Sequence, residues 1–195
     1  MGLVYGNVWT YRSVMYLLYR RQYRQKYETV AERIPPGSEV LDLCCGEGYL
    51  AQLLAEKEIR YMGLDTNRRF VEWGQRQGLD LRLADVRHTD LPEADYVCCL
   101  SSLYHFLPDP DALLARMYRA ARKAVILSEP VENVSASRHR WLRKLAVTLT
   151  SVEGKRFSDR FDEPRFRGLV RTIPAKRTDI FRAGRECLAI LSKDA

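Results

Sequence analysis

Short apolar runs alternate with longer amphipathic stretches along most of this chain. Asp95–Leu100 is nearly continuous in its apolar character, as in a strand that is covered on both faces. Leu79, Leu81 and Leu83 alternate with polar residues, which also indicates a strand. The pattern predicts five strands in this part of the chain, at Val40–Leu43, Tyr61–Leu64, Leu79–Leu83, Asp95–Leu100 and Ala124–Ser128.

Helical segments separate these strands. The apolar spacing predicts helices at Tyr49–Glu56, Asn67–Gln77 and Pro108–Arg122. An alternation of strand and helix favours an α/β fold, with a doubly wound, mostly parallel sheet and helices on both of its faces.

The C-terminal part of the chain ends differently. Asp162 is placed to cap a helix whose apolar residues Phe166, Leu169, Val170 and Ile173 have helical spacing. Two further strands, Thr178–Ala183 and Cys187–Leu191, flank Gly184-Arg185, which predicts a tight antiparallel hairpin and brings the sheet to seven strands. Ser137–Leu149 also has a helical pattern.

The break at Pro35-Pro36-Gly37 divides the chain. Before it, Val8–Arg33 reads as one long helix with tyrosines and basic residues. We therefore expect an N-terminal helical arm at residues 1–34 and one domain at residues 35–195, in which residues 130–175 form a helical insertion over the site.

Composition is that of an ordinary globular protein of 195 residues, with 46% hydrophobic and 29% charged residues. No stretch is long and apolar enough to span a bilayer, so a cytoplasmic protein is expected, as a monomer or homodimer. The five cysteines include no Cys-x-x-Cys spacing, so we expect buried thiols on strands and no metal site.

Charge is distributed unevenly along the chain. The net charge is +7, yet residues 37–130 contain 15 acidic and 11 basic side chains. A nucleic-acid binder is usually basic where it binds, whereas an acidic central part favours a cationic ligand.

The most informative segment is the turn after the first strand, Val40-Leu41-Asp42-Leu43-Cys44-Cys45-Gly46-Glu47-Gly48. In doubly wound sheets, ligands bind beyond the carboxyl ends of the strands, and glycines let the backbone approach them closely. Gly46-x-Gly48-x-x-Ala51 with Asp65 further on also fits a dinucleotide-binding turn. However, a pyrophosphate would be repelled by a carboxylate as near as Asp42, whereas an ammonium or sulfonium group would be attracted.

This segment resembles motif I of the class I S-adenosylmethionine-dependent methyltransferases, with Cys44 at the position of the family's first glycine. The resemblance covers roughly residues 36–193. It implies that Asp42 anchors the methionine end of the cofactor and that Gly46 and Gly48 form the turn around it. It further implies ribose binding by Asp65 with Thr66 beside it, adenine binding at Asp85 and Val86, and a motif IV region that begins at Ser101.

Two residues after the fourth strand are candidates for catalysis. An imidazole has a pKa that lets it accept a proton near neutral pH, so His105 is the candidate base if the acceptor is a hydroxyl. Tyr104 is a candidate for holding a cationic acceptor against its ring. Both residues have the alternative role of packing or lining the pocket.

The sequence therefore predicts an S-adenosylmethionine-dependent methyltransferase that acts on a small-molecule or lipid-like acceptor. It lacks the Asn/Asp-Pro-Pro-Tyr/Phe motif of enzymes that methylate amino groups of nucleic acids, so a nucleic-acid substrate is the less favoured alternative. A nicotinamide- or nucleotide-sugar-dependent enzyme is a second alternative. Peripheral membrane contact through the basic N-terminal helix is a third.

Overall fold

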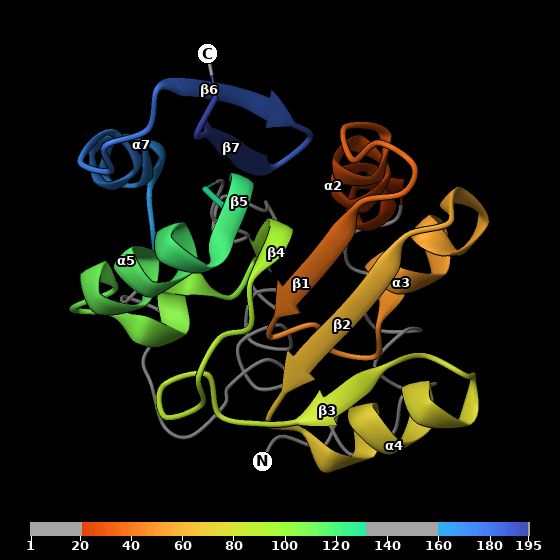
Figure 1. The fold of residues 1–195 in the computed structure, drawn as a ribbon. Coiled ribbons are helices and arrows are strands. Elements are labelled where there is room, and N and C mark those ends of the chain that lie inside the picture. The colour runs from red at the N-terminus through yellow and green to blue at the C-terminus, as the bar shows by residue number, and fades with distance from the viewer. Residues whose placement is uncertain (1–20, 132–159, 195) are drawn as a thin grey trace, which may run out of the picture.

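The computed structural model describes residues 21–131 and 160–194, and the strands of these residues form one seven-stranded sheet. The strand order is β3-β2-β1-β4-β5-β7-β6 (Figure 1). Strands β1 to β5 are parallel, and β7 pairs antiparallel with both β5 and β6. The predicted mostly parallel sheet with a C-terminal hairpin is thereby confirmed. The strands are β1 (Glu39–Leu43), β2 (Arg60–Asp65), β3 (Leu81–Leu83), β4 (Ala94–Leu100), β5 (Ala121–Pro130), β6 (Arg177–Ala183) and β7 (Glu186–Ser192).

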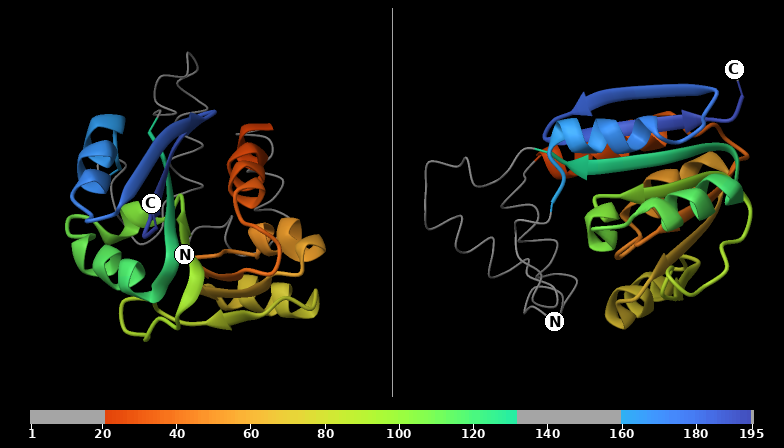
Figure 2. Two further views of the ribbon diagram at one scale, coloured as in Figure 1. Left: turned by 45° about the horizontal axis from the view of Figure 1, so that its top comes forward. Right: turned by 90° about the vertical axis from the view of Figure 1, so that its left-hand side faces the viewer.

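Helices cover both faces of the sheet (Figure 2). Leu113, Met117 and Phe166 of one layer pack on the face formed by β1 residues such as Leu41 and Leu43. On the opposite face, residues of two other helices pack against Val40. The helices are α2 (Arg21–Glu32), α3 (Tyr49–Leu54), α4 (Arg68–Arg76), α5 (Asp111–Ala120) and α7 (Glu163–Arg171), with short 3-10 turns η2 (Ala55–Lys57) and η3 (Leu103–Phe106).

The described part of the N-terminal segment belongs to the core. Val30 and Ile34 are fully buried against Val40 and Leu50. The predicted helix before residue 34 is therefore observed from Arg21 to Glu32, while residues 1–20 and the predicted helix at Ser137–Leu149 lie outside the described residues.

Local capping explains where two helices begin. The Asn67 side chain accepts a hydrogen bond from the backbone N–H of Arg69 at 3.1 Å, and Asp162 accepts one from Arg165 N–H at 2.8 Å. The predicted helix at Pro108–Arg122 is shorter in the structure, because α5 begins after Pro110 and the chain enters β5 already at Ala121.

The sheet reverses its winding direction between β1 and β4. From β1 the chain proceeds outward through β2 to β3, and it then returns to place β4 on the other side of β1. The chain therefore leaves the ends of β1 and β4 in opposite directions. In folds of this kind a crevice opens at such a point, at the carboxyl edge of the sheet, and ligands bind there.

Candidate functional site

A cavity of about 470 Å³ lies at the carboxyl ends of β1 to β4. Most of the residues singled out from the sequence line it, although they come from four different strand ends. These are Cys44, Gly46, Asp65, Thr66, Asp85, Val86, Ser101, Tyr104 and His105. The other lining residues are Leu64, Asn67, Phe70, Ala84, Arg87, Ser102 and Phe106.

The lining residues follow the order of the strands. Asp85 lies beyond β3, Asp65 ends β2, Gly46 follows β1 and Ser101 follows β4. Since these strands are neighbours in the order β3-β2-β1-β4, the cavity runs across four adjacent strand ends. An elongated ligand with distinct groups along its length fits this arrangement.

Gly46 forms the part of the turn where backbone borders the cavity. Its φ is +59°, in the left-handed region that favours glycine, and a Cβ added there would meet no atom within 4 Å. Its N–H donates to Asp65 Oδ2 at 2.8 Å. Gly46 therefore lines the cavity at a point where the space for a side chain is open.

Gly48 has a different reason to be glycine. It precedes α3 with φ +79°, and an added Cβ would lie 2.8 Å from Leu79 Cδ1. The close approach of α3 to the region before β3 therefore requires glycine here. Gly48 is not among the residues that line the cavity.

Two non-glycine residues that line the cavity also have positive φ angles, in the left-handed region of backbone conformation. Cys44 has φ +57° and Ser101 has φ +55°. Non-glycine residues in this region carry backbone strain, which is concentrated at functional sites when the surrounding structure holds it in place. Here Ser101 N–H donates to Ser128 O at 2.7 Å, which fixes the chain as it leaves β4.

Asp65 is held by backbone donors on both sides. Its Oδ2 accepts from Gly46, and its Oδ1 accepts from Asn67 N–H at 2.7 Å. Burial raises its pKa, while the N–H groups of Asn67, Gly46 and Thr66 act in the opposite direction. Asn67, rather than Asp65, provides the side-chain cap of α4, so the Asp65 carboxylate serves the turn and the cavity.

Asp42 lies within β1, two residues before Cys44, and does not line the cavity. It is 2% exposed, and Tyr61 Oη donates to its Oδ2 at 2.7 Å. Burial raises the pKa of Asp42 to about 7; the Tyr61 hydrogen bond opposes this shift, and the charge of Asp65 adds to it. A positive charge in the cavity would favour the ionised forms of both aspartates.

Asp85 marks the other end of the row. Its Oδ1 accepts from Arg87 N–H at 2.9 Å, and its Oδ2 lies 3.4 Å from Arg87 Nη1. Val86 is buried, and its carbonyl oxygen accepts from Arg116 at 2.7 Å. The Arg87 guanidinium lies 5.1 Å from the centre of the Phe106 ring, and both residues line the cavity.

The short turn η3, which follows β4, supplies Tyr104, His105 and Phe106 to the cavity lining. The rings of Tyr104 and His105 lie 4.0 Å apart between centres, and the Arg160 guanidinium lies 4.4 Å from the centre of the Tyr104 ring. Glu129, at the end of β5, accepts from Leu103 N–H at 2.6 Å and from Tyr104 N–H at 3.3 Å.

Glu129 is 1% exposed, and burial together with the charge of Glu186 raises its pKa to about 8. No sequence motif singled out Glu129, nor the cavity residues Phe70, Arg87 and Phe106. The Ser-Glu-Pro sequence that ends β5 was the available signal for Glu129, since acidic residues are unusual in a buried strand.

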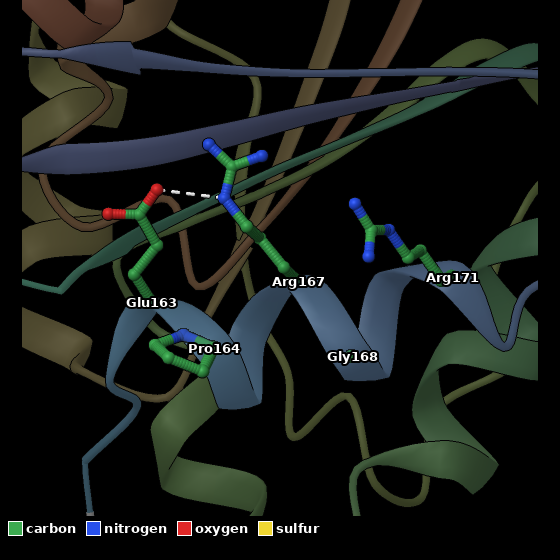
Figure 3. A pocket seen from close by; sticks show the side chains of 5 residues that line it. All are labelled: Glu163, Pro164, Arg167, Gly168 and Arg171. Atoms are coloured by element: carbon green, nitrogen blue, oxygen red, sulfur yellow. Dashed lines mark hydrogen bonds and ion pairs between the residues drawn. The ribbon is translucent and has the colours of Figure 1, made fainter.

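A second hollow, of about 510 Å³, lies along α7 and is lined by Glu163, Pro164, Arg167, Gly168 and Arg171 (Figure 3). Glu163 pairs with Arg167 at 2.8 Å and with Arg182 at 3.2 Å. One helix supplies the whole lining, and the predicted site residues do not take part in it. The cavity at the strand ends is therefore the candidate site.

Comparison with known families gives one match that covers most of the chain. The model of a methyltransferase domain family matches residues 16–170.

Among the described residues, no helix has the length and apolar character needed to cross a bilayer.

Two curated relatives have enzymatic names. Malonyl-[acyl-carrier protein] O-methyltransferase of Serratia marcescens is 32% identical over 130 residues, which are 65% of this chain and 49% of the relative. Ubiquinone biosynthesis O-methyltransferase of Hahella chejuensis is 30% identical over 96 residues, which are 45% of this chain and 40% of the relative. The chain thus spans at most about half the length of these relatives.

Solved structures share the fold at low sequence identity. A possible histamine N-methyltransferase from Thermotoga maritima has a TM-score of 0.68 at 15% identity and covers 96% of both chains. Magnesium protoporphyrin IX methyltransferase from Synechocystis, solved with bound S-adenosylhomocysteine, has a TM-score of 0.66 at 18% identity and covers 90% of this chain and 85% of that one. At these identities the likeness establishes the fold.

Proposed function

Because the chain belongs to the class I S-adenosylmethionine-dependent methyltransferases, we propose that its cavity binds S-adenosylmethionine and that the protein transfers the methyl group to a small-molecule or lipid-like acceptor. The observation that supports this most strongly is the convergence of the motif residues. Gly46, Asp65, Asp85 and Ser101 are far apart in sequence, yet they line one cavity.

The chemistry of the lining fits this cofactor. In this proposal the Asp65 carboxylate binds the ribose hydroxyls, Asp85 and Val86 contact the adenine, and the methionine moiety passes beside Gly46. The position of Gly46, Asp65, Asp85 and Val86 in the lining of one cavity supports it, as does the open space at Gly46. The raised pKa values of Asp42 and Asp65 indicate carboxylates that a cationic ligand would stabilise. In this proposal Cys44 and Thr66 border the cofactor, and the buried Asp42 acts on it through its charge.

When bound, the cofactor supplies a methyl group on a positively charged sulfur. The protein's contribution is to hold the acceptor in line with that methyl group and to exclude water, which accounts for much of the acceleration in reactions of this kind. His105 is the proposed base where the acceptor begins as a hydroxyl, and Tyr104 is proposed to contact the acceptor through its ring. The pairing of both rings on η3 supports a shared role at the acceptor side.

The acceptor class is inferred from the similar proteins, whose names refer to malonyl-[acyl-carrier protein] and to ubiquinone biosynthesis. We propose that residues 1–34 and 130–175 shape the acceptor pocket. The burial of Val30 and Ile34 against the sheet supports a role for the N-terminal segment within the domain.

Calorimetric titration tests the cofactor. We expect S-adenosylmethionine to bind with micromolar affinity and NAD not to bind. Asp65→Ala removes the proposed ribose contact and should abolish binding, whereas Asp80→Ala removes an exposed aspartate paired with Arg82 outside the cavity and should leave it unchanged. Binding of NAD in place of S-adenosylmethionine would overturn the proposal.

A further inference from the structure

The five cysteines of the chain differ in how far solvent reaches them. Four are buried, as expected from the sequence: Cys45 is 8% exposed, and Cys98, Cys99 and Cys187 are 0% exposed. Cys44 is only half-buried, and it lines the cavity at the strand ends. An oxidant dissolved in the solvent therefore reaches the Cys44 thiol before it reaches any of the others.

A second thiol, that of Cys99, lies next to Cys44. Cys44 follows Leu43 at the end of β1, and Leu43 is paired with Cys99 of β4 in the sheet. Leu43 and Cys99 belong to one core cluster, and Cys44 packs against it, so both thiols lie on the same face of the sheet. Neighbouring strands are about 4.8 Å apart, which is within the range of Cα distances that a disulfide spans.

A hydrogen bond joins the two thiols. This hydrogen bond to Cys44, together with burial, holds the pKa of Cys99 well above its usual value. A hydrogen bond that raises the pKa of a thiol stabilises its protonated form, so the Cys99 S–H group donates to the Cys44 sulfur. Cys99 is thus the protonated partner, whereas the Cys44 sulfur accepts the hydrogen bond and is also the one that solvent reaches.

The remaining thiols are placed away from this pair. Cys45 is adjacent in sequence, but its Sγ lies against β2, where a Cβ added at Gly63 would be 2.6 Å from it. Cys98 belongs to the core cluster on the opposite face of the sheet. Cys187 is on β7, which β5 separates from β4, so two strand spacings, or roughly 10 Å, lie between β7 and β4. The half-buried thiol therefore has one partner that is placed for a disulfide.

We propose that Cys44 is a site of reversible oxidation by hydrogen peroxide, and that Cys99 resolves the oxidised Cys44 by forming a disulfide with it. The Cys44 sulfur attacks one oxygen of the peroxide, the O–O bond breaks, and Cys44 becomes a sulfenic acid while the other oxygen leaves as water with the thiol proton. The Cys99 sulfur then attacks the Cys44 sulfur, the S–O bond breaks, and the hydroxyl leaves with the Cys99 proton as a second water. The two thiols give up two electrons, and one peroxide is reduced to two waters.

The disulfide acts on the cavity through the turn that follows β1. Cys44 and Gly46 both line the cavity, and Cys44 has φ +57°, so its backbone is in the left-handed region before any oxidation. An S–S bond is about 2.05 Å long, much shorter than a hydrogen bond between two sulfurs, so its formation draws Cys44 toward β4 and changes the lining of the cavity. We therefore expect oxidation to weaken ligand binding there, and this consequence rests on the proposed cofactor.

Counting thiols tests the oxidation site without any ligand. The reduced protein is treated with a small excess of hydrogen peroxide, unfolded and alkylated with N-ethylmaleimide, and its mass is then measured. Wild type should lose two of its five alkylated cysteines, and dithiothreitol should restore them. Alkylation of all five cysteines after the peroxide treatment would overturn the proposal.

Three variants identify the pair. Cys44→Ser should keep every remaining thiol, because peroxide does not reach the buried cysteines. In Cys99→Ala the sulfenic acid has no partner, so Cys44 should be trapped by dimedone, a reagent that adds to sulfenic acids. Cys98→Ala is the matched control, since Cys98 precedes Cys99 on β4 and is equally buried but lies on the opposite face; it should lose two thiols as wild type does. Loss of two thiols in Cys44→Ser or in Cys99→Ala would overturn the pairing.

Calorimetry with S-adenosylhomocysteine tests the effect on the cavity. We expect peroxide to weaken its binding to wild type by roughly tenfold or more, dithiothreitol to restore it, and Cys44→Ser not to respond to peroxide. Bound S-adenosylhomocysteine should also slow the loss of thiols, since Cys44 lines the cavity. Unchanged affinity of the disulfide form would overturn the effect on ligand binding. If the reduced protein does not bind S-adenosylhomocysteine, the proposed cofactor is wrong, while the thiol count alone decides the oxidation site.

Discussion

Gly46 and Gly37 adopt the same backbone conformation but lie in different surroundings. Their φ angles are +59° and +73°, and an added Cβ would meet no atom within 4 Å at either position. Gly46 lines the cavity, whereas Gly37 lies in the turn before β1. Alanine substitutions at the two positions can therefore be compared. Both place a Cβ on left-handed backbone and lower stability, but only the substitution at Gly46 adds a methyl group beside the cavity.

We expect Gly46→Ala and Gly37→Ala to destabilise the fold similarly, by about 1 kcal/mol each, because both place a Cβ on left-handed backbone. Gly46→Ala alone should weaken S-adenosylmethionine, by roughly tenfold or about 1.4 kcal/mol, since its methyl group projects into the cavity. Urea unfolding and calorimetry measure the two effects. Equal cofactor affinity in both variants would mean that the ligand does not approach this turn.

Asp42 links the fold to pH. Burial raises its pKa to about 7, whereas an aspartate in an unfolded chain titrates near about 3.9. Between these values the folded protein holds a proton that the unfolded chain has released, so this residue makes stability fall as pH rises through the window. Asparagine does not titrate, and its amide oxygen still accepts from Tyr61. We expect Asp42→Asn to gain stability relative to wild type by about 1 kcal/mol per pH unit from about pH 4 to about pH 7.

Asp95→Asn is the control with the opposite sign. Burial alone would raise the pKa of Asp95, but Glu39 N–H, Lys123 and Arg122 outweigh it and lower that pKa. Its ionised form therefore stabilises the protein, and this contribution is lost as pH falls through the folded pKa. From about pH 4 to about pH 7 Asp95 is ionised in both the folded and the unfolded chain, so Asp95→Asn should lower the measured unfolding free energy by a constant amount, whereas the gain of Asp42→Asn should grow with pH. A parallel pH response of Asp42→Asn and wild type would show that Asp42 is ionised throughout.

Among the elements, η3 is held by the carboxyl group of Glu129, which is distant in sequence. Glu129 holds the N–H groups of Leu103 and Tyr104 from the end of β5, and η3 supplies three residues of the cavity wall. Glu129→Ala leaves these donors without their acceptor and should destabilise the protein by about 2–4 kcal/mol. Glu129→Gln retains an acceptor oxygen in the same place and should recover most of this loss. Thermal unfolding of the two variants tests it; glutamine as damaging as alanine would show that the hydrogen bonds to Leu103 and Tyr104 do not account for the loss.

The elements that could be predicted from the sequence are those whose stabilising contacts join residues only a few positions apart. Asn67 and Asp162 cap their helices through neighbouring N–H groups, and Gly184-Arg185 turns the final hairpin, so all three were readable within a few residues. The same holds for the cavity residues that follow each strand. By contrast, Lys26 meets Ser101 across 75 residues and Glu129 meets Leu103 across 26. Such contacts depend on strand order and packing, which no local pattern contains.

The fold places four strand ends in one row along one cavity, and the proposed ligand would contact all four. A ligand that binds only the folded site makes each opening of that site less favourable, by about 2.7 kcal/mol at a concentration of 100 times its dissociation constant. Hydrogen exchange through such openings slows by the corresponding factor of roughly one hundred. The cofactor should therefore protect segments that are distant in sequence but adjacent at the carboxyl edge of the sheet.

We expect S-adenosylmethionine to slow exchange at residues 44–48, 65–67 and 101–106 together, as measured by mass spectrometry. The opposite edge provides the internal control, because Gly37 N–H bonds Lys57 O and Arg60 N–H bonds Ser38 O away from the cavity. Amides at residues 37–39 and 57–60 should exchange at the same rate with and without the ligand. Protection confined to α7 would place the ligand in the second hollow, and protection of residues 44–48 without 101–106 would mean that the ligand ends before it reaches β4.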